Sequence, residues 1–281
     1  MSNAFPRIAL MLVVMLCCGW DAQGSDSTRT HPTIHALFVH DVEVALGDAG
    51  SFFTAPFHFS GTEWLYAGAV VGGTPLLMSL DESIRQKVGR STVSSLNNDF
   101  WDIPTRYGVV TYANVFSIAT YATGLFIRND ELRVSGRLMF EALSLAGVSV
   151  ITVRYIAARS RPYSGDGPWR FHGFTWNNEI QSFPSGHTTV AFALSTVLAE
   201  RIDNIWARIG LYGLATLTAF ARVYNNQHWM SDVVIGAGFG LAAGLHVVAR
   251  EEERSAAALP GQGRLQVLPS PGGITLVILL K

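Results

Sequence analysis

The sequence predicts an all-α protein, a multi-helix bundle with five or six apolar helices that lie in a membrane. Of its 281 residues, 49% are hydrophobic and only 15% are charged, against about 25% charged in a typical soluble protein. Apolar stretches of helix length also recur along the chain, separated by short polar links. The net charge is −1 and no basic stripe is present, so we expect no nucleic-acid partner.

The first 24 residues predict a secretory signal peptide. Arg7 precedes the apolar run IALMLVVMLCCGW and a small-residue stretch, DAQGSDS, with cleavage expected near Gly24. An uncleaved anchor helix is the alternative, and a lipoprotein signal at Cys18 is weaker because small residues do not precede that cysteine. Under both main interpretations residues 25–60 form an exported N-terminal extension. Its scattered histidines lack the pairing of a zinc site, so we predict no metal there.

Five apolar stretches after residue 100 approach the length of a helix that spans a lipid bilayer. They cover residues 109–127, 138–153, 188–199, 209–221 and 233–249. The first has no charge over 19 residues, close to the roughly 20 that span a bilayer. The last carries Gly236, Gly240 and Gly244 on one helix face, where another backbone can approach. Glycine-rich packing in a soluble helical core is the alternative.

Residues 64–80 are also apolar, but Gly72-Gly73-Thr74-Pro75 interrupts them, and we expect a re-entrant or surface-lying segment there. Arginines in three alternate links, 128–137, 201–208 and 250–254, place those links on the cytoplasmic side. The loops 154–187 and 222–232 then face outward. An exported N-terminus agrees with this orientation only if residues 64–80 do not cross the membrane.

The domain division follows from these patterns. Residues 61–250 form the helical domain, and residues 251–281 form a C-terminal tail. The tail contains RLQVLPSPGGITLVILLK, which predicts two short strands around a Pro-Ser-Pro-Gly-Gly turn.

Three polar clusters lie where the outward helix ends would meet. In RYIAARSRP, Arg154 and Arg161 are seven residues apart, or two helical turns, before Pro162 ends the helix. Two guanidinium groups on one face can hold the oxygens of one phosphate. Arginines that extend from a membrane edge into water are the simpler explanation of this cluster taken alone.

The second cluster, Pro184-Ser185-Gly186-His187, opens an apolar helix. Ser185 can cap that helix, and Gly186 lets an anion approach the free N–H groups at its positive end. His187 adds a proton donor beside this position. Ordinary helix capping is the alternative.

The third cluster is ARVYNNQHWMSD. His228 and Asp232 are four residues apart, so on a helix the carboxylate can hold one imidazole nitrogen and leave the other free. Arg222 adds another cation, although a surface His–Asp pair is the plainer explanation. Together the three clusters suit phosphoryl transfer, in which positioned cations and N–H groups stabilise charge on phosphoryl oxygens. No carboxylate cluster for a divalent ion accompanies them, so we expect neither a metal nor another cofactor.

In order and spacing these clusters resemble the signature of the type-2 phosphatidic acid phosphatase and haloperoxidase superfamily: Lys-x6-Arg-Pro, Pro-Ser-Gly-His, and Ser-Arg-x5-His-x3-Asp. The motifs span residues 154–232, and the helical pattern extends the resemblance to about 105–250. Two positions depart from the family pattern. Arg154 stands in place of lysine, and Ala221 in place of the serine before Arg222.

The resemblance implies a phosphohistidine mechanism. His228 attacks phosphorus and Asp232 orients it, while His187 protonates the leaving alkoxide and then activates water. The phosphoryl oxygens are held by Arg154, Arg161, Ser185, Gly186 and Arg222. A vanadium haloperoxidase shares this anion pocket and is the less expected outcome.

The substrate class that we expect is a lipid phosphate or diphosphate, such as an isoprenyl diphosphate or a phosphatidate. Aromatic residues in the 163–183 loop suit a bilayer interface, or alternatively a lid over a soluble pocket. The expected location is a bacterial inner membrane with a periplasm-facing active site. The alternatives are a soluble periplasmic acid phosphatase and a non-catalytic membrane protein with a vestigial anion site. No feature of the sequence predicts an oligomeric state.

Overall fold

The computed structural model describes residues 32–88, 98–258, 265–270 and 273–278. The secondary structure of these residues is helical apart from one hairpin, which confirms the predicted fold class. The predicted signal peptide, residues 1–24, lies outside the described residues. The α-helices are α2 (Ile34–Thr54), α3 (Gly61–Val88), α4 (Asn98–Tyr107), α5 (Val110–Ile127), α6 (Asp130–Ala157), α7 (Gly186–Ile202), α8 (Ile205–Tyr224) and α9 (Met230–Ala257). Short 3₁₀ turns lie at Ala55–His58, Pro162–Ser164 and Asn178–Ile180.

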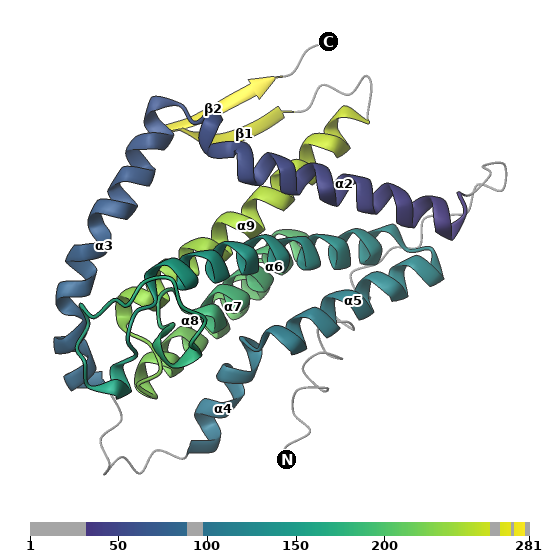
Figure 1. The fold of residues 1–281 in the computed structure, drawn as a ribbon. Helices are drawn as coiled ribbons and strands as arrows, with labels where there is room; N and C mark the ends of the chain where they lie inside the picture. The colour runs from purple at the N-terminus through teal and green to yellow at the C-terminus, as the bar shows by residue number, and fades with distance from the viewer. Residues whose placement is uncertain (1–31, 89–97, 259–264, 271–272, 279–281) are drawn as a thin grey trace.

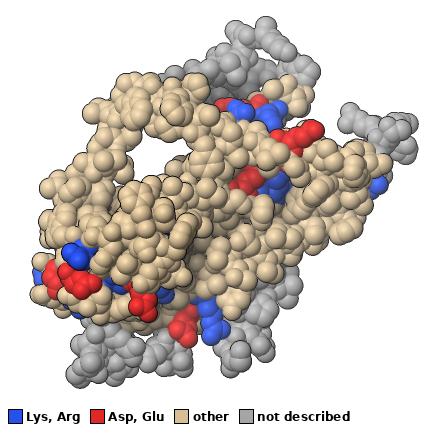
Figure 2. All heavy atoms as spheres, in the orientation of Figure 1, with Lys and Arg blue, Asp and Glu red and all other residues tan. Residues whose placement is uncertain are grey.

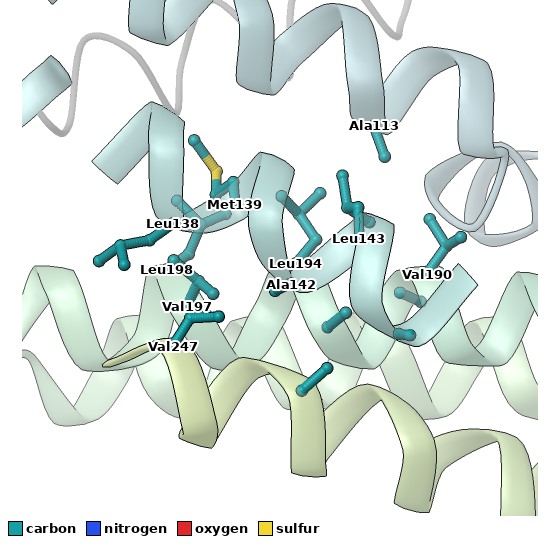
Figure 3. Packing of buried hydrophobic residues seen from close by; sticks show 14 of the residues in the cluster. Ala113, Leu138, Met139, Ala142, Leu143, Val190, Leu194, Val197, Leu198 and Val247 are labelled. Carbon is teal, nitrogen blue, oxygen red and sulfur yellow. The ribbon is translucent and has the colours of Figure 1, made fainter. Parts of the chain in front are cut away.

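Helix α7 lies in the centre of the bundle and is apolar on all sides. Leu194, Val197 and Leu198 are buried on it, and they pack against Leu138 of α6 and Val247 of α9 (Figure 3). A helix without a polar face is stable only when neighbours surround it. The core is therefore built around α7, with α6 and α9 beside it.

The glycines of α9 fit the predicted close approach of a second helix. A Cβ atom at Gly240 would lie 2.5 Å from the carbonyl oxygen of Thr189, and one at Gly236 would lie 2.6 Å from that of Ser185. Helices α7 and α9 therefore meet backbone to backbone. This contact fixes the start of α7 against the start of α9.

All five predicted apolar stretches after residue 100 are helices, α5 to α9. By length and composition, three of them can cross a membrane: α5, α6 and α9. Helix α7 has 17 residues and is largely enclosed by its neighbours. Figure 2 shows a broad uncharged surface, with charged side chains near the lower left end and beside α2.

The predicted interruption at residues 72–75 is wrong. Helix α3 runs unbroken for 28 residues and contains Pro75. Proline removes one intrahelical hydrogen bond. The helix continues through Pro75 because the turns on both sides of it keep their own hydrogen bonds. Helix α3 extends from the α2 side of the molecule to the end where α9 begins (Figure 1).

Helix α2, within the predicted extension 25–60, lies across the bundle away from that end (Figure 1). Buried Asp41 accepts a hydrogen bond from Arg133 of α6 at 2.6 Å, and buried Asp48 accepts one from Arg254 of α9 at 2.7 Å. These two ion pairs attach α2 to the helical domain. The tail forms the predicted hairpin, in which strands β1 (Leu265–Ser270) and β2 (Gly273–Ile278) pair antiparallel.

Candidate active site

Arg154 joins the first and second predicted clusters. It lies in the last turn of α6, which ends at Ala158 in a left-handed conformation. Its Nε donates to the carbonyl oxygen of Pro184 at 2.8 Å. A Cβ atom at Gly186 would lie 2.9 Å from Nη2 of Arg154. Glycine at this position therefore leaves space for the guanidinium group at the start of α7.

Arg161 joins the first and third clusters. Its Nη1 donates to the carbonyl oxygen of Gln227 at 3.0 Å and lies 3.5 Å from Nε2 of His228. Its Nε and Nη2 donate to the carbonyl oxygen of Asn178 at 3.2 Å. Neutral carbonyl groups fix the side chain without cancelling its charge, so the cation is available to an anion.

Arg222 and His187 lie at the same place. Arg222 ends α8, and its buried Nε has no hydrogen-bond partner among the described residues. Burial, together with the charges of Arg222, Arg154 and Arg161, lowers the pKa of His187 to about 4. All three arginines are therefore close enough to His187 for their charges to act on its ring. Such a concentration of positive charge is suited to an anion.

His228 is held as a defined tautomer. Its Nδ1 lies 2.7 Å from the carbonyl oxygen of Ser182, and a carbonyl accepts hydrogen bonds without donating them. Nδ1 therefore carries the proton, and the unprotonated Nε2 is directed to the arginine side. Complete burial lowers the pKa of His228 to about 3, which keeps the ring neutral near neutral pH.

The predicted contact between His228 and Asp232 requires a correction. The two residues do not share a helix face, because α9 begins at Met230. Oδ2 of Asp232 lies 3.6 Å from Nδ1 of His228, slightly beyond hydrogen-bond distance, although the two side chains remain close. Asp232 instead accepts from the backbone N–H of Trp229 at 2.8 Å and from the Ser182 hydroxyl at 2.5 Å.

Ser185 occupies the N-cap position of α7, but its side chain makes no capping hydrogen bond. Its buried hydroxyl accepts instead from the Thr188 hydroxyl at 3.0 Å, and its N–H donates to the carbonyl oxygen of Asp232 at 2.9 Å. The expected side-chain cap is therefore wrong, because Thr188 competes for the hydroxyl. Gly186 and His187 are in the first turn of α7, where backbone N–H groups lack intrahelical acceptors.

The structure brings all eight predicted site residues to one end of the bundle. These are Arg154, Arg161, Ser185, Gly186, His187, Arg222, His228 and Asp232. Three further residues were not predicted: Ser182 beside His228, Arg159, and Asp81 of α3, both of the latter in ion pairs. The sequence offered a signal only for Arg159, a charged residue in the RYIAARSRP stretch.

Aromatic side chains lie on the outside of this end. Tyr155 packs its ring 4.5 Å from that of Trp176 and 5.8 Å from that of Phe174, centroid to centroid. Trp176 is 68% exposed and Phe174 is 70% exposed. Large exposed aromatic rings next to an anion centre form a surface that is both apolar and close to positive charge.

This arrangement defines a helical domain with an arginine-lined anion centre and two histidines. Residues 136–255 match the PAP2 superfamily. The match confirms the family resemblance drawn from the motifs.

Two curated relatives and one solved structure illustrate the similarity. A lipid A 1-phosphatase of Porphyromonas gingivalis is 35% identical over 111 residues, which are 38% of this chain and 22% of the relative. An acid phosphatase of Zymomonas mobilis is 26% identical over 68% of this chain and 70% of its own length. The transmembrane PAP2-type phosphatidylglycerolphosphate phosphatase of Bacillus subtilis shares the fold, with a TM-score of 0.50 at 20% identity over 79% of this chain and 96% of its own. The chain spans less than half the length of the lipid A 1-phosphatases that it matches.

Proposed function

We propose that this protein is a metal-independent phosphatase that hydrolyses a lipid phosphate monoester or diphosphate through a phosphohistidine intermediate. The observation that carries the proposal is the tautomer of His228. Its unprotonated Nε2 lies 3.5 Å from Nη1 of Arg161, and the charges of Arg161, Arg154 and Arg222 all act on His187 at the same end of the bundle. A nucleophile is thus placed beside the cations that would hold its target.

In the first step, Nε2 of His228 donates its lone pair to phosphorus as the P–O bond to the leaving group breaks. His187 transfers a proton to the leaving alkoxide, so that a neutral alcohol departs. The three arginines and the N–H of Gly186 stabilise the phosphoryl oxygens. Nδ1 keeps its proton throughout, because the Ser182 carbonyl oxygen holds it.

In the second step, His187, now neutral, takes a proton from water while the water oxygen attacks phosphorus. The N–P bond breaks, its electron pair returns to Nε2, and inorganic phosphate leaves. A bound phosphate brings negative charge next to His187, which raises the pKa of the ring from about 4. The substrate itself therefore promotes the protonated form that the first step needs.

A lipid is the substrate class that the surroundings of the site favour. The exposed rings of Phe174 and Trp176 lie beside the arginine centre, where they can enter a headgroup layer while lipid chains stay in the bilayer. The lipid A 1-phosphatase relatives act on a substrate of this class. We place the protein in a bacterial inner membrane, with the active site on the periplasmic side.

The acid phosphatase similarity supports a second candidate, a phosphatase of water-soluble esters. Both candidates use the same chemistry. They differ in the role of Phe174 and Trp176, which would contact a bilayer in a lipid phosphatase and cover the pocket in a phosphatase of soluble esters. A lipid phosphatase hydrolyses lipid phosphates in mixed micelles far better than a soluble aryl phosphate. A soluble-ester phosphatase shows the reverse preference.

The deciding experiment is phosphate release by the purified protein over a panel of lipid phosphates, lipid diphosphates and an aryl phosphate. His228→Ala is expected to reduce kcat by about 10⁴-fold or more, the scale lost with an essential nucleophile. His187→Ala should reduce it by about 10²–10⁴-fold, the range for one general acid. Vanadate should inhibit and EDTA should not. Full activity in His228→Ala would contradict the mechanism.

A further inference from the structure

A buried ion-pair network joins α3 to the segment that carries His228. Arg159 is fully buried, and its Nη1 donates to Oδ1 of Asp232 at 2.6 Å while its Nη2 donates to Oδ2 of Asp81 at 2.8 Å. Asp81 also accepts from the backbone N–H of Ser231 at 2.9 Å and from its hydroxyl at 2.6 Å. One guanidinium group therefore lies between two carboxylates where water does not reach.

The network attaches α3 to the site end of the bundle. Asp81 lies outside residues 136–255, the part that matches the superfamily. A second contact is made by Arg85 of α3, whose guanidinium lies 5.9 Å from the ring centre of buried Trp229, the neighbour of His228. Figure 2 shows an opening between α3 and the remaining bundle away from this end. The attachment of α3 is therefore concentrated at the active site.

The charges in this network do not cancel. Asp81 and Asp232 carry two negative charges and Arg159 carries one positive charge, which leaves one negative charge beside His228. Burial raises the pKa of Asp81. The three hydrogen-bond donors that reach its carboxylate, from Arg159 and Ser231, act against that rise and favour the ionised form. The His228 ring is neutral at rest, but it becomes positive once Nε2 bonds to phosphorus, because Nδ1 keeps its proton. The remaining negative charge balances that positive ring.

We propose that Asp81 is a positioning residue for the reaction, acting through Arg159 and Asp232 to stabilise the positively charged His228 ring of the phosphoenzyme. The inference rests on the proposed function. Without the Asp81 charge, Arg159 and Asp232 cancel each other, and the ring loses its counter-charge in a buried, low-dielectric place.

The test is Asp81→Asn in the full-length protein, which keeps the shape of the side chain and removes its charge. We expect kcat to fall by about 10–100-fold, the range found when a buried partner acts through another group, with little change in KM. Vanadate mimics the five-coordinate phosphorus at Nε2, so its affinity should fall by a similar factor. The affinity for inorganic phosphate, which the arginines bind, should stay within about two-fold.

Three control variants separate charge from structure. Glu82→Gln removes a charge from the next residue of α3, on a partly exposed side chain, and should leave the ratio of vanadate to phosphate affinity unchanged. Ser231→Ala deletes hydrogen bonds of the network but keeps its charges, so it should alter this ratio less than Asp81→Asn. The double variant Asp81→Asn/Arg159→Gln restores one net negative charge and should recover part of the lost ratio.

The outcomes are distinct. An unchanged kcat and ratio in Asp81→Asn overturn the inference, and so does an equal loss of vanadate and phosphate affinity, which indicates a purely structural role. If Asp81→Asn does not fold, as judged by thermal unfolding in detergent, the double variant is compared with the wild type. A ratio lowered about ten-fold there contradicts the charge argument. If the wild type hydrolyses no phosphate ester, the proposed function fails, while the binding ratios still test Asp81.

Discussion

At the scale of single residues, the site depends on which arginine charges are neutralised by carboxylates and which are not. Arg161 is held by neutral carbonyl oxygens, whereas the buried Arg159 is paired with two carboxylates. The charge of Arg161 is thus available to an anion, whereas that of Arg159 is held in a buried ion-pair network. Two arginines separated by one residue, Ser160, therefore have different roles because their side chains leave the chain toward different partners.

The two histidines predict a loss of stability in mild acid. Burial lowers the pKa of His228 to about 3, and mainly burial lowers that of His187 to about 4, whereas an unfolded histidine titrates near 6.5. Between pH 6.5 and these values the unfolded state binds more protons than the folded state, so stability falls as the pH falls through this window. Thermal unfolding in detergent from pH 7 to pH 4.5 measures the effect.

The control for this prediction is His228→Asn, whose side-chain amide can place a hydrogen-bond donor at the Nδ1 position, toward the Ser182 carbonyl oxygen, and cannot titrate. Its melting temperature should decline less steeply with falling pH than that of the wild type. An equal slope in both proteins would show that His228 does not contribute to the acid sensitivity.

The motifs predicted that the site residues come together, but not the hydrogen bonds and ion pairs that hold them. The seven-residue spacing of Arg154 and Arg161 predicted two turns of one helix, which is wrong, because α6 ends at Ala157 and Arg161 lies in the segment beyond it. The two side chains nevertheless lie at the same end of the bundle.

The motifs could not reveal that the Ser182 carbonyl oxygen, rather than Asp232, holds Nδ1 of His228, because backbone acceptors leave no trace in a residue pattern. The role of Asp81 could not be predicted either, because its partners lie 78 and 150 residues away along the chain.

At the scale of elements, the start of α7 is placed by its contact with α9. The glycines of α9 were readable from their four-residue spacing, which is a local property of one helix. The continuity of α3 was not readable, because glycine and proline show where a helix is weakened and not whether neighbouring turns maintain it. Short-range signals thus predicted packing faces better than helix ends.

Alanine substitutions at two glycines of α9 are expected to change the stability of the protein in opposite directions. A Cβ atom at Gly240 would lie 2.5 Å from the Thr189 carbonyl oxygen and 2.8 Å from the Ala193 nitrogen, whereas one at Gly238 would meet nothing within 4 Å. Gly240→Ala must push α7 away, so we expect a loss of about 1–3 kcal/mol, the usual cost of overpacking. Gly238→Ala should instead stabilise the helix by about 0.5–1 kcal/mol.

Thermal unfolding of the two variants in the same detergent checks this pair, with phosphate release as a second measurement. Because α7 carries Gly186 and His187, activity should fall in Gly240→Ala and persist in Gly238→Ala. Equal stability of the two variants would contradict the close contact between α7 and α9.

At the scale of the whole molecule, the course of α3 determines whether the two ends of the bundle lie on the same side of a bilayer or on opposite sides. Its 28 residues extend about 42 Å at 1.5 Å per residue, more than the roughly 30 Å of a hydrocarbon core. Large apolar side chains stay exposed along it, with Leu65 at 69%, Val71 at 73% and Leu76 at 72%. Helix α3 begins on the side of α2 and reaches the active-site end at Asp81 (Figure 1). Its length, exposed apolar side chains and course suit a helix that crosses the membrane, although its composition is less apolar than that of α5, α6 and α9, the three described helices that qualify by both length and composition.

If α3 crosses, the start of α3 and the active site lie on opposite sides of the membrane, so an exported N-terminal extension and an outward-facing site cannot both hold. We predict that the site faces outward and that the start of α3 faces the cytoplasm. Single cysteines at the exposed positions Thr62 and Glu179, introduced with Cys17 and Cys18 replaced by serine, report the two ends. A membrane-impermeant maleimide should label Glu179→Cys in intact spheroplasts and Thr62→Cys only after permeabilisation. Labelling of both from outside would mean that α3 does not cross, and the opposite pattern would reverse the orientation while keeping the crossing.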